Sequence, residues 1–105
     1  MPESPTVSDI ASYVRAKNAG PFWTTIDIFL PDDAAFTTLV SSSAITAERI
    51  GERYRVDPTD VRVFELPELR VVKVSLPRRA PQGGLHDRDL HSGQQHVPLA
   101  TMRLG

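Results

Sequence analysis

Three histidines near the C-terminus are the residues whose types could most readily bind a metal. His86, His91 and His96 are spaced five residues apart, with Asp87 and Asp89 between them. The chain has no cysteine, so a zinc site would need these imidazoles and carboxylates as ligands. On a helix, successive histidines at this spacing point about 140° apart, and on a strand they alternate between faces. Only a folded-back loop would gather them, so we expect a solvated loop and no metal site.

A second chemically suggestive segment is the basic, turn-forming stretch 15–22, which leads into an apolar strand. Asn18 and Gly20 tolerate left-handed backbone conformations, so successive amides here could form an anion-binding nest. Lys17 would add a positive charge to such a nest. The alternative is an ordinary connection, because no glycine-rich phosphate motif accompanies these residues.

Composition narrows the classes of protein to which the chain can belong. A length of 105 residues predicts one domain over 1–105, with a loose N-terminus over 1–6. The 12 basic and 13 acidic residues nearly cancel, which argues against nucleic acid as a partner. The absence of cysteine excludes disulfides, iron–sulfur clusters and thiol catalysis. Because no apolar run approaches the length of a membrane span and the N-terminus lacks a signal layout, we expect a cytoplasmic protein.

Periodicity and turn residues define the expected elements. Asp32 or Asp33 caps the first long helix, and Pro67-Glu68 forms a two-residue hairpin connection between two strands. Tyr13 and Val14 leave a strand as the alternative to the first helix. In chain order the predicted elements are a helix over 7–16, a strand over 22–30, helices over 32–42 and 46–54, strands over 61–66 and 69–76, a long loop over 77–96 with a turn of helix near 87–92, and a strand over 97–104.

This order predicts an α+β, ferredoxin-like sandwich. Its four-stranded antiparallel sheet would have the spatial order 4-1-3-2, with helices on one face and a long loop replacing much of the second helix. Alternation along 22–30 places an aliphatic set toward the helices and a mixed set on the open side. The aliphatic set is Ile26, Ile28 and Leu30, and the mixed set is Trp23, Thr25, Asp27 and Phe29.

In that strand order Asp27 would lie between Lys73 and Arg103. One interpretation is a pair of cross-strand ion pairs that stabilises the sheet, each by roughly 0.2–1 kcal/mol. The other interpretation is a docking surface, in which these charges act together with Trp23 and Phe29.

The two polar segments resemble the signatures of the DUF4387 family. The N-terminal signature is carried by Arg15, Lys17, Asn18, Ala19, Gly20, Pro21 and Phe22. Asp27 matches an acidic position in the first strand. The C-terminal signature is carried by Asp87, Arg88, Asp89, Gln94, Gln95, His96, Pro98 and Leu99. The chain is also similar to the small ferredoxin-like C-terminal domain of AtuA-type acyclic terpene utilisation proteins.

The resemblance implies the small subunit of a two-component enzyme whose large subunit is AtuA-like. Such an enzyme would act on an organic acid or an acyl-CoA as a lyase or hydratase; no cofactor is specified. The family supplies no established catalytic residues, so Lys17 and His96 are catalytic candidates on the basis of their own types and positions. Strand alternation, rather than the resemblance, indicates an interface that comprises Trp23, Asp27, Phe29, Lys73 and Arg103. Ligand-binding positions would be Arg15, Asn18, Gly20, Asp87, Arg88, Gln94 and Gln95.

Other functions remain open at this point. One is a stand-alone enzyme that uses Lys17, His91 or His96. Another is a stand-alone ligand-binding or regulatory ferredoxin-like module, and a homo-oligomer is compatible with each of them. In the expected topology Lys17 and His96 approach each other only if the long loop folds back along the sheet, or across a subunit boundary.

Overall fold

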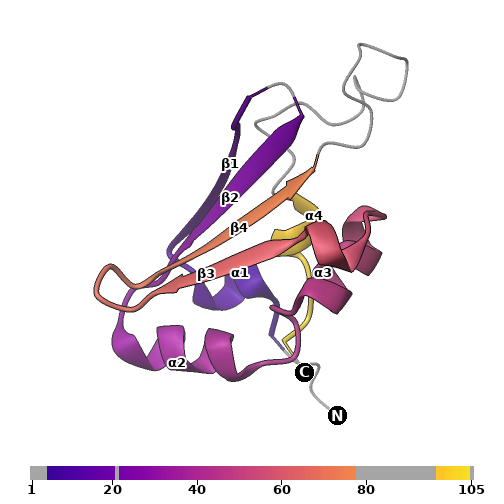
Figure 1. The fold of residues 1–105 in the computed structure, drawn as a ribbon. Coiled ribbons are helices and arrows are strands. Elements are labelled where there is room, and N and C mark those ends of the chain that lie inside the picture. Colours follow the sequence, from indigo (N-terminus) through magenta and orange to yellow (C-terminus); the bar gives the residue numbers. More distant parts are fainter. Residues whose placement is uncertain (1–4, 21, 78–96, 105) are drawn as a thin grey trace.

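A computed structural model of the chain describes residues 5–20, 22–77 and 97–104. Four antiparallel strands form one sheet, and the helices lie on one side of it (Figure 1). The expected α+β class is confirmed, and the arrangement is consistent with a ferredoxin-like sandwich. The elements are α1 (Val7–Ile10), β1 (Tyr13–Asn18), β2 (Trp23–Phe29), α2 (Asp33–Ser41), α3 (Ala47–Tyr54), the 3-10 helix η1 (Pro58–Asp60), β3 (Arg62–Leu66), β4 (Val71–Pro77) and α4 (Val97–Ala100).

The strand order is β1-β2-β4-β3. β2, β4 and β3 lie beside one another as expected, but the edge beside β2 is occupied by β1. The prediction of a last strand over 97–104 was therefore wrong. Residues 97–100 are helical, and the extended end makes only an isolated bridge between Thr6 and Arg103. Leu99, Ala100 and Met102 are all buried, a pattern that a strand with one covered face does not give.

The predicted helix over 7–16 is helical only in its first turn. Thr6 caps α1 in a capping box with Asp9, and the chain is extended again at Ala11. From Tyr13 onward it pairs with β2, so the strand alternative was correct for this part. β-branched and aromatic residues favour this outcome, and Val14 gains a place against the core.

The two longer helices begin as expected, with Asp32 capping α2 and Thr46 capping α3. The β3–β4 connection differs, because it spans residues 67–70 rather than Pro67 and Glu68 alone. Arg70 adopts a left-handed φ of 54° just before β4. The longest described helix, α2, has nine residues, so no described helix can cross a membrane.

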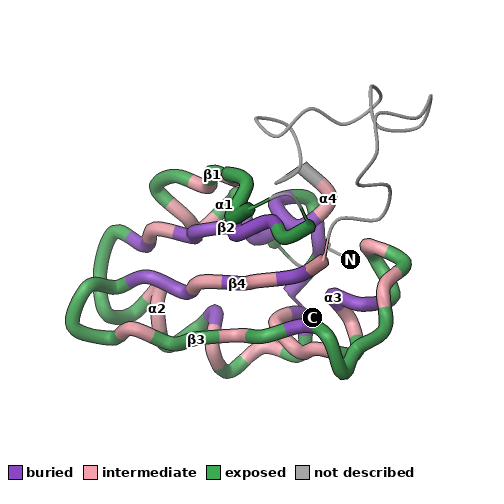
Figure 2. Tube along the Cα trace, turned by 45° about the horizontal axis from the view of Figure 1, so that its top comes forward, coloured by how far each residue is buried: buried purple, intermediate pink, exposed green. Residues whose placement is uncertain are grey.

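The core lies between the sheet and the helices. Ile26 and Ile28 of β2 and Val72 and Val74 of β4 are fully buried, which confirms the aliphatic face predicted from alternation. The helices contribute Val7, Leu39, Ile50 and Leu99 to the same cluster. Burial follows the two central strands, whereas the outer strands are largely exposed (Figure 2).

Tyr54 joins α3 to the C-terminal helix α4. Its hydroxyl oxygen accepts a hydrogen bond from the backbone N–H of Leu99 at 3.0 Å. Arg53 reinforces the contact by donating to the carbonyl of Pro98 at 3.0 Å and to Thr101 at 2.8 Å. Burial raises the pKa of the Tyr54 phenol, because the phenolate would lose its hydration there.

This raised pKa predicts a loss of stability at alkaline pH. The unfolded chain releases the phenol proton above about pH 10, whereas the folded chain retains it, so the free energy of unfolding falls as the pH rises beyond that value. Urea unfolding between pH 8 and 11 should show a steeper fall for the native chain than for Tyr54→Phe. Equal slopes for the two chains would contradict the assignment.

Candidate functional site

The face of the sheet opposite the helices carries polar and aromatic side chains that no described helix covers. We call it the open face, and strand register defines its members. They are Tyr13, Arg15 and Lys17 in β1; Trp23, Thr25, Asp27 and Phe29 in β2; Val71, Lys73, Ser75 and Pro77 in β4; and Arg62, Phe64 and Leu66 in β3.

Positive charge is concentrated on the open face. The face carries one negatively charged residue, Asp27, and four positively charged ones: Arg15, Lys17, Arg62 and Lys73. Four cations against one anion give the face a formal charge of +3, although the whole chain carries −1. The electrostatic potential of this face therefore attracts acidic groups.

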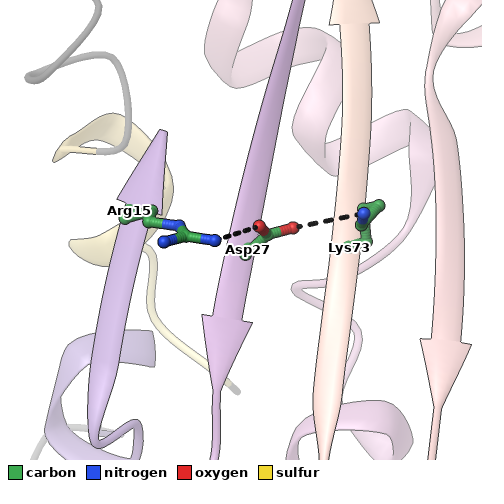
Figure 3. A network of polar contacts seen from close by, with 3 residues as sticks. All are labelled: Arg15, Asp27 and Lys73. Atoms are coloured by element: carbon green, nitrogen blue, oxygen red, sulfur yellow. Dashed lines mark hydrogen bonds and ion pairs between the residues drawn. The ribbon is translucent and has the colours of Figure 1, made fainter. Parts of the chain in front are cut away.

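Asp27 lies in the middle of the face, between two cations from neighbouring strands (Figure 3). Its Oδ2 atom is 3.5 Å from Nη2 of Arg15, and its Oδ1 atom is 3.9 Å from Nζ of Lys73. The Asp27 side chain is only 7% exposed, whereas those of Arg15 and Lys73 are 48% and 39% exposed. The carboxylate is thus desolvated, while both cations keep contact with water.

Two long ion pairs compensate poorly for this burial. Oδ1 of Asp27 is buried and has no hydrogen-bond partner among the residues that the structure describes. A buried acceptor without a donor costs about 1–3 kcal/mol, and more when it is charged. The carboxylate therefore keeps an unused acceptor beneath the accessible side chains at the centre of the face.

Aromatic rings border the carboxylate on one side. The rings of Tyr13 and Phe29 lie 5.9 Å apart between centroids. The guanidinium carbon of Arg15 is 5.4 Å from the Phe29 centroid, within range of a cation–π contact. Arg15 is thus held by both Phe29 and Asp27, while Tyr13 and Phe64 remain 59% and 47% exposed.

The model of the family described as "Domain of unknown function (DUF4387)" matches residues 7–103. The chain belongs to the DUF4387 family. No curated protein and no solved structure matches it.

Several predicted site residues of this DUF4387 chain do lie together on the open face. Four residues expected at an interface are members of the open face: Trp23, Asp27, Phe29 and Lys73. Asp27 and Lys73 are neighbours, as predicted, with Oδ1 of Asp27 3.9 Å from Nζ of Lys73. Arg103 does not belong to the open face, because its segment bridges Thr6 instead of pairing with β2. The position beside Asp27 that was predicted for Arg103 is occupied by Arg15 of β1, which had been assigned to ligand binding.

The N-terminal loop is shorter than expected. Lys17 and Asn18 are the last two residues of β1 and pair with Thr25 and Thr24, so they do not sit in a turn. Successive amides of a strand point in opposite directions, which rules out an anion-binding nest at these two positions. Gly20 does occupy the turn, with a φ of 86° that favours glycine.

The C-terminal candidates lie outside the described residues. This applies to Asp87, Arg88, Gln94, Gln95 and His96, and to His86 and His91. Reasoning from the sequence missed Tyr13, Arg62 and Phe64 as members of the open face. The signal for Arg62 and Phe64 was present in the alternation along β3, whereas Tyr13 required β1 to be recognised as a strand.

Proposed function

We propose that this chain is the small subunit of a two-component enzyme whose large, AtuA-like subunit docks on the open face and supplies most of the active site. The observation that carries this proposal is Asp27. A desolvated carboxylate with an unused oxygen is costly in the isolated chain. A partner that donates a hydrogen bond to Oδ1 would remove that cost.

The composition of the open face supports a protein partner. Tyr, Trp and Arg are enriched at interface hot spots, and the face offers Tyr13, Trp23 and Arg15 in exposed positions. Arg15 contacts Asp27, Tyr13 lies one row away and Trp23 two rows away on the other side. A partner seated on all three would shield contacts to the carboxylate from water.

Charge indicates which partner fits. A second copy placed face to face would bring two surfaces of +3 together, and like charges across an interface are unfavourable. An acidic surface on a different chain would complement the face and speed the encounter. We therefore favour a hetero-oligomer over a homo-oligomer.

The proposed class of reaction is supported by the resemblance to AtuA-type proteins alone. We propose an organic acid or acyl-CoA substrate and a lyase or hydratase reaction. Lys17, at one end of the open face, would lie at the edge of the boundary with the large subunit and contribute to the active site there. His96, the other catalytic candidate, lies outside the described residues.

Co-expression with the AtuA-like protein of the same genome, followed by size-exclusion chromatography, tests the proposal. The native chain should co-elute with the large subunit. Phe64→Glu should abolish co-elution, because it adds a negative charge to the open face. Thr37→Glu adds the same charge to an exposed position on α2 and should leave co-elution unchanged. Separate peaks for the native pair at micromolar concentration would refute the docking model.

A further inference from the structure

One end of the open face carries a row of polar side chains that the Asp27 contacts do not involve. Lys17 pairs with Thr25, Thr25 with Ser75, and Ser75 with Arg62. Four strands thus contribute one residue each to a straight row, which we call the cationic row. Two hydroxyls lie at its centre and a cation lies at each end.

The polar groups of the cationic row are not engaged elsewhere in the described part of the chain. The ion pairs of this face join Asp27 to Arg15 and Lys73 and leave Lys17 and Arg62 out. Thr25 is 9% exposed, Ser75 is half-buried, and Lys17 and Arg62 are exposed. The row therefore has a sheltered floor of hydroxyls and exposed charged ends.

The dimensions suit a small anionic group. Strands lie about 4.8 Å apart, so the backbones of Lys17 and Arg62 are separated by about 14 Å. Their long side chains can close over the central hydroxyls from both ends. A guanidinium, an ammonium and two hydroxyl donors are the groups that recognise carboxylate or phosphate oxygens.

The surroundings of the row are compatible with an anion. Asp27 lies one row away along β2, and its repulsion is offset by Arg15 and Lys73, which flank it. On the other side, Trp23 pairs with Pro77 and is 37% exposed. Its indole would form a wall against the apolar part of a ligand.

We infer that the cationic row binds the carboxylate or phosphate group of a small-molecule ligand. The inference rests on the proposed function only for identifying that ligand as the substrate of the two-component enzyme. The row then anchors the charged end of the substrate from the side of the small subunit. Lys17, predicted to be catalytic, acts in this arrangement as a binding group.

Titration of the isolated chain with inorganic phosphate and, separately, with acetate tests the inference, with binding followed by NMR at low ionic strength. Shifts should centre on residues 17, 25, 62 and 75. Preference for phosphate identifies a phosphorylated ligand such as a CoA thioester, and preference for acetate identifies an organic acid. Arg62→Gln should weaken binding about tenfold, as expected for a lost charge-assisted hydrogen bond. Thr25→Val, which keeps the side-chain shape, should weaken it about threefold.

Arg49→Gln provides the matched control, because it removes the same charge from α3, which packs on the other face. It should leave binding unchanged. Equal weakening by Arg49→Gln and Arg62→Gln, or no binding of either anion at millimolar concentration, would overturn the inference. The result is independent of co-elution with the large subunit, so failure of one proposal is distinguishable from failure of the other.

Discussion

Asp27→Val is expected to abolish binding of the large subunit without destabilising the isolated chain. Loss of one member of a buried, hydrogen-bonded charge pair at an interface costs about 2–5 kcal/mol of binding free energy. In the isolated chain the same substitution removes a desolvated carboxylate whose two ion pairs are 3.5 and 3.9 Å long. Arg15 and Lys73 are partly exposed and can turn to water. The free energy of unfolding should therefore stay the same or rise by about 1 kcal/mol.

Denaturant unfolding and co-elution, measured on the same preparation, check both parts of this result. Asp33→Asn is the control, since Asp33 forms a shorter ion pair of 2.8 Å with Arg70 but is 83% exposed. An exposed pair of this kind contributes about 0–1 kcal/mol, and the control should bind the large subunit normally. If Asp27→Val lost more than about 2 kcal/mol of stability and still bound the partner, Asp27 would have a structural role.

Stability and partner binding must both be measured for Asp27→Val, because a carboxylate in a sheet is often no more than part of a stabilising ion pair. A stabilising role predicts that Asp27 contributes more to folding than a hydrophobic residue of similar shape would. A binding role predicts the reverse, because groups that are costly in the free chain are satisfied only in the complex. The unused Oδ1 atom favours the binding role.

Sequence alternation was sufficient to place Asp27 and Lys73 on one face beside each other. Their strands are central and strongly patterned, so the pairing does not depend on which segment occupies the edge. The neighbour of Asp27 on its other side, Arg15 of β1, could not be predicted in the same way. Segments 13–18 and 97–104 both contain apolar residues at alternating positions, and the competition between them for the edge is decided by packing across the whole domain.

The cationic row could not be predicted because register depends on the length of a turn. A two-residue turn at Pro67-Glu68 would pair Leu66 with Leu69, and hence Arg62 with Lys73. The observed turn over 67–70 pairs Leu66 with Val71, which places Arg62 opposite Ser75. An error of two residues keeps each side chain on its face, yet it moves a cation from one row to the next.

Leu99→Ala is expected to lower the free energy of unfolding by about 3 kcal/mol, within the range of about 2–5 kcal/mol for buried leucines. Leu99 is fully buried in the core cluster, and its backbone N–H donates to Tyr54. A typical domain is stable by about 5–15 kcal/mol, so this loss is a large fraction of the total. Denaturant titration followed by circular dichroism would measure it.

Leu69→Ala makes the same chemical change at a side chain that is 70% exposed, and it should cost less than about 0.5 kcal/mol. Equal costs at the two positions would mean that residues 97–104 do not complete the core. Leu99→Ala also distinguishes an effect on the core from an effect on the open face. Leu99→Ala should impair binding only as far as the chain unfolds. On the proposed docking model, Asp27→Val should impair binding in a chain that remains fully folded.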